Sequence, residues 1–417
     1  MIRNIKIKHL PIKVIDGDRS NRYPKRSEFQ KTGVLFLNTA NIVQNRLDLT
    51  QANFISLEKF NEIRKGRLQQ FDIVITTRGS IGKVALFNLT PLTGIINAQM
   101  LILRADSKVI DPKFLFYQLC DNRFQTKLRN FASGAAQPQI PMMDLKEIEI
   151  MVPPLPIQRK IAAILSAYDD LIENNTRRIK ILEDMAQTLY REWFVHFRFL
   201  GHENVPMVES PMGPIPQGWE IGEFGDIVEN VREKVKPGKH LDHLPYVPID
   251  CIPRRSISLM EHKPPSAAKS SLIAFKRNDI LFGAMRSYFH KVIFAPFDGI
   301  TRQTCFVFRS RDLNNYPFDL LTAFQDSTVQ YSSNHSTGST IPYATWDNAL
   351  AMMPIFRPPD LLIKRFSDVV IPMLDSIQMM LKKNANLRQT RDLLLPKLIS
   401  GEIDVSELDI DEDIKSN

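Results

Sequence analysis

An internal repeat constrains the fold of this 417-residue chain more than any other feature of its sequence. The motif Leu-Ile-Leu-Arg ends at Arg104 and the related motif Phe-Val-Phe-Arg ends at Arg309, so the two copies lie 205 positions apart (309 − 104). At the same offset, the Pro-Pro pair at 153–154 corresponds to the pair at 358–359. One offset that holds across half of the chain predicts a duplicated domain, and a period this long excludes a solenoid of short repeats.

The segments upstream of these motifs are also related. Residues 71–86 read FDIVITTRGSIGKVAL and residues 278–294 read NDILFGAMRSYFHKVIF, which places Arg78 opposite Arg286 after a one-residue insertion. Further along, SGAAQPQIP in the first half resembles STGSTIP in the second. The chain therefore contains two pseudo-symmetric copies of a globular domain, each followed by a helix.

Each globular half is predicted to be mixed α and β. Short apolar runs bounded by Gly and Pro, such as IVITT and MLILR in the first half and ILFGA and CFVF in the second, predict β-strands. A helical segment over 112–131 lies among them. The predicted division is a first globular domain over 1–154, a long helix over 155–200, a linker and second globular domain over 201–357, a second long helix over 358–401, and a solvated acidic tail over 402–417.

The two long helical segments carry matched seams. From Ile161 to Trp193 the seam residues are spaced alternately by four and three positions, which is the a/d pattern of a coiled coil, and the same offset of 205 gives a second seam from Phe366 to Leu398. Helices this long would extend beyond a domain of this size, so we predict that they pair as an antiparallel coiled coil; the alternative is that each packs on its own domain. The seam positions expected to define the pairing are Asn175, Leu182, Leu189, Asn384, Leu387 and Leu394.

Two asparagines predict the register of this pair. Antiparallel coiled coils place a positions opposite d positions, and opposing Asn175 to Asn384 sets Tyr168 on Arg391, with a cation over the ring. A buried Asn pair can hydrogen-bond only in register. The alternative is that both Asn side chains face solvent or a partner subunit. Inside the second helix we expect a kink near Pro372, because proline cannot donate the helical hydrogen bond.

Charge and composition narrow the class of protein. The net charge of +8 and the pI near 9.2 favour a polyanionic partner. No run of about 18 apolar residues and no leader pattern is found, so we expect a cytoplasmic protein. Cys120, Cys251 and Cys305 are far apart, and we expect reduced thiols rather than disulfides or zinc ligands.

No motif in the sequence predicts catalysis. GSIGK at 79–83 resembles a phosphate loop, but Thr77 and Val84 stand where a Walker A motif has Gly and then Ser or Thr. The Pro-Pro pairs lack the Asn and the aromatic residue of the adenine-methylating motif, and no Gly-rich AdoMet loop follows a strand. His240 and His243 lack further metal ligands nearby. We therefore predict a chain that is not an enzyme and binds no metal or cofactor of its own.

Polar and basic residues occur instead in loops at equivalent places in both halves. Arg pairs bidentately with guanine and Asn or Gln with adenine, while Lys and Ser commonly contact phosphates. Taken alone, any one of them has an ordinary interpretation as a solvated loop residue, but their repetition on two divergent copies of one frame suits two different DNA half-sites. The predicted DNA-binding residues are Arg22, Lys25, Arg26, Arg78, Lys83, Asn97, Gln99, Arg286, Lys291, Arg302, Gln303, Ser336 and Thr340.

Six segments in a fixed order carry a resemblance to a known family. They are IDGDRSNRYPK (15–25), GSIGKVAL (79–86), PPLPIQRKIAAILSAYDDLIENNTRRIKILE (153–183), GPIPQGWE (213–220), GSTIPYATW (338–346) and RDLLLPKLISGEID (391–404). Over nearly its whole length the sequence resembles type I restriction-modification specificity subunits. The resemblance implies two target-recognition domains, similar to the DNA-reading domain of Taq-type adenine methyltransferases, each of which reads half of a bipartite site in double-stranded DNA.

The same resemblance implies the partners. The paired helices would set the spacing of the half-sites and dock two methyltransferase subunits, which methylate adenine with AdoMet. Motor-nuclease subunits that use ATP and Mg would add restriction, and this chain would bind no cofactor. Two alternatives remain: a non-catalytic DNA-binding scaffold of another defence complex or an inactive relative, and a stand-alone enzyme with a hidden catalytic motif.

Overall fold

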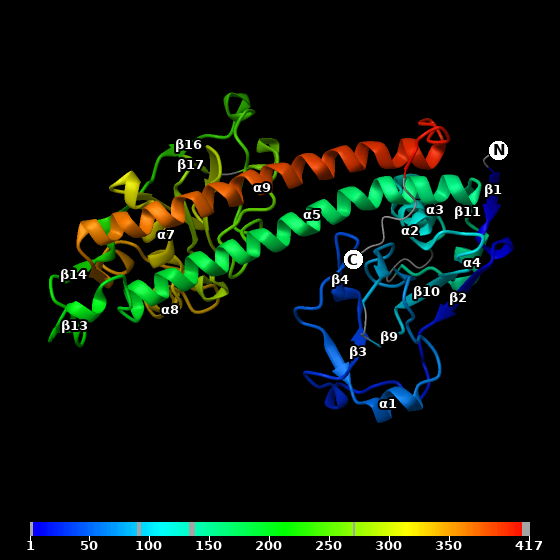
Figure 1. Cartoon of the computed structure of the whole chain (residues 1–417), viewed down its shortest axis with the longest axis horizontal. Helices are drawn as coiled ribbons and strands as arrows, with labels where there is room; N and C mark the ends of the chain where they lie inside the picture. The colour runs from blue at the N-terminus through cyan, green and yellow to red at the C-terminus, as the bar shows by residue number, and fades with distance from the viewer. Residues whose placement is uncertain (1–2, 90–92, 133–137, 270–271, 411–417) are drawn as a thin grey trace. The chain divides into compact units, whose positions relative to one another are not determined.

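The computed structural model describes residues 3–89, 93–132, 138–269 and 272–410, which form two compact units (Figure 1). The first unit comprises Met1–Leu171 with Leu387–Asn417, and the second comprises Ile172–Asn386. Both units mix helices and strands, as predicted from the sequence. The boundary falls inside each long helix, so each helix belongs partly to one unit and partly to the other.

A four-stranded antiparallel sheet forms the centre of the first unit. Its order is β2 (Ile12–Asp16), β10 (Met100–Ala105), β7 (Asp72–Thr76) and β8 (Val84–Phe87). The apolar runs IVITT and MLILR supply β7 and β10, whose side chains are buried on both faces. Around this sheet lie β6 (Asn53–Ile55), β3 (Val34–Leu37) and β9 (Gly94–Ile96) as a second sheet, the hairpin β4 (Ile42–Val43) and β5 (Arg46–Leu47), and the pair β1 (Arg3–Lys6) and β11 (Glu149–Val152).

The second unit repeats this arrangement. Its four-stranded sheet has the order β15 (Val228–Asn230), β21 (Cys305–Ser310), β18 (Ile280–Gly283) and β19 (Val292–Phe294). A three-stranded sheet accompanies it, and the pair β14 and β24 corresponds to β1 and β11. Their bounds are β16 (Lys234–Val235), β17 (Leu272–Phe275), β20 (Gly299–Arg302), β14 (Glu220–Glu223) and β24 (Pro354–Arg357). The equivalent strand order agrees with the duplication inferred from the sequence.

A buried ion pair is repeated with the sheet. Asp72 accepts two hydrogen bonds from Arg104, at 2.7 and 2.8 Å, and Asp279 accepts two from Arg309, at 2.8 and 2.7 Å. Both carboxylates are buried, which makes this bidentate pairing necessary. The residue before each Asp, Phe71 in the first unit, adopts a left-handed conformation in both units. The same turn and ion pair are thus found at the start of β7 in the first unit and of β18 in the second.

Short helices cover each sheet. The predicted helical segment over 112–131 is two helices, because Asp121 has an extended backbone and caps the second one. The short helices of the first unit are α1 (Leu57–Glu62), α2 (Pro112–Cys120), α3 (Asn122–Asn130) and α4 (Met142–Glu147), and those of the second are α6 (Phe224–Ile227), α7 (Tyr316–Phe324) and α8 (Asp326–Asn334).

The first long helix ends earlier than predicted. Helix α5 spans Leu155–Tyr190 and continues as one π-helical turn over Arg191–Val195, so the predicted helix over 155–200 is too long. Phe197 has a φ of 58°, a left-handed conformation that cannot continue a helix. The ring of Phe194 packs within 6.0 Å of Trp219, and this aromatic packing takes the chain away from the helix axis.

The second long helix, α9, spans Asp360–Ser400 without interruption. It continues through Pro372, where we expected a kink. The ring of Pro372 lies on the exposed side of the helix, so the carbonyl group that loses its helical donor can bind water instead. Beyond the helix, the predicted solvated tail is wrong in part: Val405 is buried against α2 and the ends of both long helices.

Within the second unit the two long helices pair in the predicted antiparallel register. Asn175 Nδ2 donates to Asn384 Oδ1 at 2.9 Å. Trp193 lies 5.9 Å from Phe366, centroid to centroid. Ile179 and Ala186 pack into the core of this unit, and the seam residues Leu182 and Leu189 pack against it partly buried. In the first unit, Leu394 packs with the helix ends, and Leu387 is half-buried.

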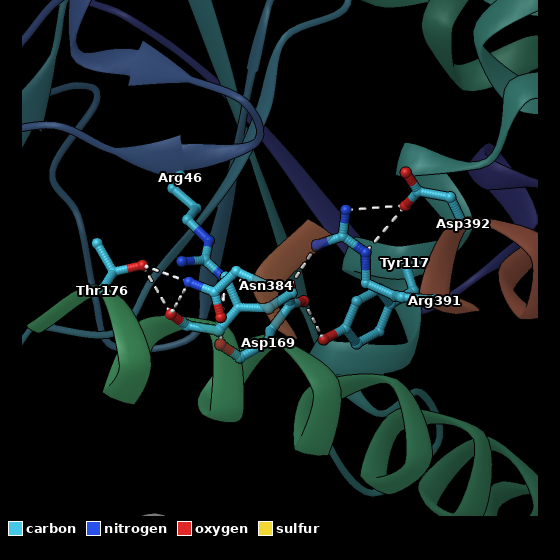
Figure 2. A network of polar contacts seen from close by, with 8 residues as sticks. Arg46, Tyr117, Asp169, Thr176, Asn384, Arg391 and Asp392 are labelled. Atoms are coloured by element: carbon cyan, nitrogen blue, oxygen red, sulfur yellow. Dashed lines mark hydrogen bonds and ion pairs between the residues drawn. The ribbon is translucent and has the colours of Figure 1, made fainter. Parts of the chain in front are cut away.

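One layer of the predicted seam is wrong. Arg391 does not pair with the ring of Tyr168; its Nη1 donates to Asp169 Oδ1 at 2.5 Å (Figure 2). Asp169 also accepts from Tyr117 Oη at 2.7 Å and from Arg46 Nη2 at 3.2 Å. A carboxylate offers the guanidinium a stronger partner than an aromatic face, and here one carboxylate joins both long helices to the first globular domain.

Candidate nucleic-acid interface

Strand register brings several loops of the first unit to one edge of the central sheet. Asp16, the last residue of β2, lies opposite Leu101, and Met100, the first residue of β10, lies opposite Thr76. Ile75 of β7 lies opposite Val84, the first residue of β8. The loops that follow β2, join β7 to β8 and precede β10 therefore leave the sheet at the same edge. We call this edge, with its three loops, the loop edge of the first unit.

Seven of the predicted DNA-binding residues lie in these three loops. They are Arg22, Lys25 and Arg26 after β2, Arg78 and Lys83 between β7 and β8, and Asn97 and Gln99 before β10. Direct contacts join the loops, since the N–H of Thr77 donates to the carbonyl of Gln99 at 2.9 Å. Lys25 and Arg26 are both exposed. The structure thus brings the candidates of the first half together at one edge.

Asn97 does not fit its predicted role. Its side chain is buried, accepts from the N–H of Gln99 at 3.0 Å and donates to Gln99 Oε1 at 3.3 Å. These bonds shape the turn before β10 and leave little of the amide for a base. Lys83 is half-buried, with Nζ 3.5 Å from the carbonyl of Thr39, whereas no hydrogen bond from the Arg78 side chain to a described residue is found.

A hollow of about 450 Å³ opens beside the loop after β2, and the sequence analysis missed most of it. Four basic residues line it: Arg19, Arg22, Arg64 and Lys65. The first two come from the segment IDGDRSNRYPK, and the other two come from a loop more than 40 residues later in the chain. Only the fold could show that these charges share one site. A hollow with this charge suits a phosphate group.

Asp18 braces this basic hollow. Burial by itself would raise the pKa of its carboxyl, but hydrogen bonds from the Ser20 hydroxyl and from the backbone of Ser20, Arg64 and Lys65 outweigh burial and lower it. The carboxylate is therefore charged at neutral pH and holds the two segments together. Gly17 is required at this junction, because a Cβ there would lie 2.4 Å from the Asn97 carbonyl oxygen.

The second unit has an equivalent loop edge. Asn230 ends β15 opposite Phe308, Gly283 ends β18 opposite Cys305, and the neighbouring Phe282 faces the first residue of β19. The loops at this edge carry Arg286, Lys291 and Gln303, and Arg302 ends β20. Ser336 begins the short strand β22 (Ser336–Thr337), and Thr340 lies in the turn between β22 and β23 (Tyr343–Ala344). Arg302, Gln303 and Thr340 are exposed.

A neighbouring loop packs on the key arginine in both units. The N–H of Arg286 donates to the carbonyl of Pro342 at 2.8 Å, and in the first unit Arg78 forms an isolated bridge with Gln139. These are the loops that the sequence paired as STGSTIP and SGAAQPQIP, although residues 133–137 lie outside the described residues. Ser336 is less free than predicted, because its Oγ donates to the carbonyl of Ser332 at 2.8 Å.

No cluster that could hold a metal ion is found within residues 3–89, 93–132, 138–269 and 272–410. His240 and His243 are both exposed. The three cysteines are free; burial raises the pKa of the Cys305 thiol to about 11, and it also raises the pKa of the Cys120 and Cys251 thiols. Every helix in the described part of the chain is too short or too polar to cross a lipid bilayer.

Comparisons with known proteins agree with this geometry. A family model described as the type I restriction modification DNA specificity domain matches residues 13–184. The type I restriction enzyme MjaIX specificity subunit of Methanocaldococcus jannaschii is 29% identical over 354 residues, which is 81% of this chain and 78% of that protein. The HindI specificity subunit of Haemophilus influenzae is 25% identical over 187 residues, 43% of this chain and 40% of that protein.

A solved structure shares the fold. The crystal structure of a type I restriction-modification S subunit from M. genitalium aligns with a TM-score of 0.57 at 16% identity, covering 95% of this chain and 96% of that one. Two globular units with equivalent loop edges and a pair of long helices define a duplicated fold. The chain is similar in sequence to type I restriction enzyme specificity subunits and shares the fold of an S subunit. The sequence matches support a role in the DNA sequence specificity of a type I complex.

Proposed function

We propose that the two units read the two halves of a bipartite site in double-stranded DNA, one at each loop edge. The observation that carries this proposal is the repetition of the loop edge on a shared frame. Both units share the four-stranded sheet and its buried ion pair. The loops that carry Arg78 and Gln99 in one unit and Arg286 and Gln303 in the other differ in length and sequence. Shared frames with different loops suit different base sequences.

The chain contributes recognition and no chemistry in this proposal. No metal cluster lies among the described residues, and the sequence lacks a methyl-transfer motif, which is consistent with catalysis by other subunits. Two methyltransferase subunits that bind AdoMet would dock on the long helices and methylate adenine. Motor-nuclease subunits that use ATP and Mg would join them for restriction. A scaffold of a different defence complex is the alternative, and gene neighbours encoding neither kind of subunit would favour it.

Domain exchange tests the proposal. The loops of the first unit over 17–33, 77–83 and 97–99 would be replaced with those of a relative, while Arg46, Tyr117 and the helices stay unchanged, since these hold the domain to the helix pair. Adenine methylation would then be mapped across the genome of cells that contain the methyltransferase subunit. We expect one half-site to change and the other to remain, and the matched exchange in the second unit should do the reverse. A change in both half-sites from either exchange would contradict the proposal.

A further inference from the structure

The loop between β18 and β19 differs in kind from its counterpart in the first unit. Between β7 and β8 the chain turns tightly through Gly79 and Gly82, both with positive φ. Between β18 and β19 it forms a 3-10 turn, Ser287–Phe289, flanked by Arg286 and His290, each left-handed with a φ of 53°. Residues with side chains rarely adopt this conformation, so neighbouring contacts must hold the loop in place.

His290 supplies those contacts. Its Nδ1 lies 3.1 Å from Asp326 Oδ1 and its Nε2 lies 2.8 Å from the carbonyl oxygen of Phe324. The N–H of Arg255 donates to the carbonyl of His290 at 2.9 Å, and the Arg255 guanidinium lies 3.1 Å from Asp326. The segment that carries Arg255 and the loop that carries His290 therefore form one braced element at the loop edge of the second unit.

Arg254 lies on this element in an unusual setting. Its guanidinium carbon is 3.9 Å from the centroid of the Phe289 ring, and the exposed ring of Tyr288 packs against the same ring at 4.8 Å. No hydrogen bond or ion pair joins the Arg254 guanidinium to another described residue, whereas its neighbour Arg255 pairs with Asp326. The donors of Arg254 are therefore available while the ring holds the guanidinium in place.

The surroundings of Arg254 favour DNA. Lys291 Nζ donates to the carbonyl of Ile249 at 2.6 Å; burial lowers the pKa of this lysine, and the positive charge of Arg254 lowers it further against the opposing effect of Asp250. Two cations this close together attract a polyanion. Both side chains lie in loops that reach the loop edge, where the sheet places the bases of a bound duplex under the proposed function.

We propose that Arg254, held over the ring of Phe289, reads a guanine in the half-site of the second unit through bidentate hydrogen bonds to O6 and N7 in the major groove. This inference rests on the proposed function. A guanidinium that is already held in place by a ring loses less entropy when it binds a base, and its planar fork matches the O6 and N7 acceptors of guanine. A phosphate contact is needed for every DNA sequence, so an arginine held for that purpose would be expected in both units. The corresponding turn in the first unit, Gly79-Ser80-Ile81-Gly82, contains no aromatic residue.

The experiment compares three variants of the full chain expressed with its methyltransferase partner. R254K keeps the charge but loses the planar fork, R254A loses both, and F289L removes the ring beneath the arginine. R311K is the matched control, because Arg311 follows the opposite end of β21 and its Nε donates to the carbonyl of Gly225 at 2.9 Å. Genome-wide mapping of methylated adenine and binding to duplexes with each base at the tested position are the measurements.

We expect R254K and R254A to accept other bases at one G·C position of the second half-site, with discrimination about tenfold or more lower. The first half-site should be unchanged, F289L should show part of the effect, and R311K none. A wild-type second half-site without a G·C pair, or an unchanged motif in both Arg254 variants, would overturn the inference. Normal discrimination by R254K with uniform weakening by R254A would assign Arg254 to a phosphate. Absence of any methylated bipartite motif for the wild type would instead refute the proposed function.

Discussion

Asn175 Nδ2 donates a hydrogen bond to Asn384 Oδ1 at 2.9 Å, and this pair forms a polar layer between apolar seam residues of the two long helices. Asn384 is 1% exposed, and its Nδ2 also lies 3.3 Å from Thr176 Oγ1 and 3.4 Å from the carbonyl oxygen of Ile172. A shift of either helix by one turn would bury these amides without partners. The pair therefore selects one register, and with it one alignment of the helices.

The Asn pair should contribute cooperatively to stability. Asn384→Ala should lower the free energy of unfolding by about 1–3 kcal/mol, and Asn175→Ala by less, because Asn175 is more exposed and keeps fewer bonds. The double variant should lose less than the sum of the two, since each single change leaves the other amide without its partner. Urea unfolding of all four proteins measures this difference. Strict additivity would show that the two side chains act independently.

The ion pair between Asp169 and Arg391 should matter more than a surface pair on the same helix. Arg391→Ala leaves the largely buried Asp169 carboxylate with only Arg46 and Tyr117, and should cost about 1–3 kcal/mol. The control is Arg177→Ala, because the pair between Arg177 and Glu173 is exposed and its loss should change stability by less than about 0.5 kcal/mol. Thermal and urea unfolding give both values. Equal effects would contradict a bracing role for Asp169.

The equivalent arginines of the two loop edges should act on different half-sites. Arg78→Ala should weaken DNA binding of the assembled complex by about 1–3 kcal/mol and relax one position of one half-site, and Arg286→Ala should do so in the other. Methylation maps and binding to substituted duplexes identify the positions. Uniform weakening across all sequences, with a smaller dependence on salt, would assign these arginines to phosphates instead.

Asp319 should make the second unit less stable as the pH rises. The carboxyl lies in the buried helix α7, and burial raises its pKa well above the usual value, although the Ser310 hydroxyl opposes this. Between the pKa of about 3.9 in unfolded chains and the raised pKa, the folded state binds the extra proton, so stability falls as pH increases. Asp319→Asn should remove this slope in urea unfolding from acid to alkaline pH, whereas Asp368→Asn, a change at an exposed carboxyl of the same unit, should keep it.

The sheets and the helix pairing were predicted well from the sequence, because each pattern occurs in both halves of the chain. Two copies of a strand pattern at one offset indicated equivalent sheets, and a seam with Asn at matching layers predicted the pairing of Asn175 with Asn384. The ion pair of Asp72 with Arg104 could also have been found, since both residues recur as Asp279 and Arg309.

The parts that the sequence did not predict depend on contacts between distant segments. Asp169 replaces Tyr168 as the partner of Arg391 because Arg46 and Tyr117 converge on the same carboxylate, and no local pattern reveals such convergence. Arg254 was missed for the opposite reason: it has no counterpart in the first half, so an argument from repetition could not select it. The burial of Asn97 likewise comes from tertiary packing rather than residue type.

The burial of Val405 beside Tyr117 and Ile161 determines the order in which the chain can fold during synthesis. The second unit uses only residues from Ile172 to Asn386, so all of its parts leave the ribosome before the first unit is complete. The N-terminal unit must wait for Leu398 and Val405 to cover its apolar surface. Until those residues have been made, part of the apolar surface of the first unit lacks its cover.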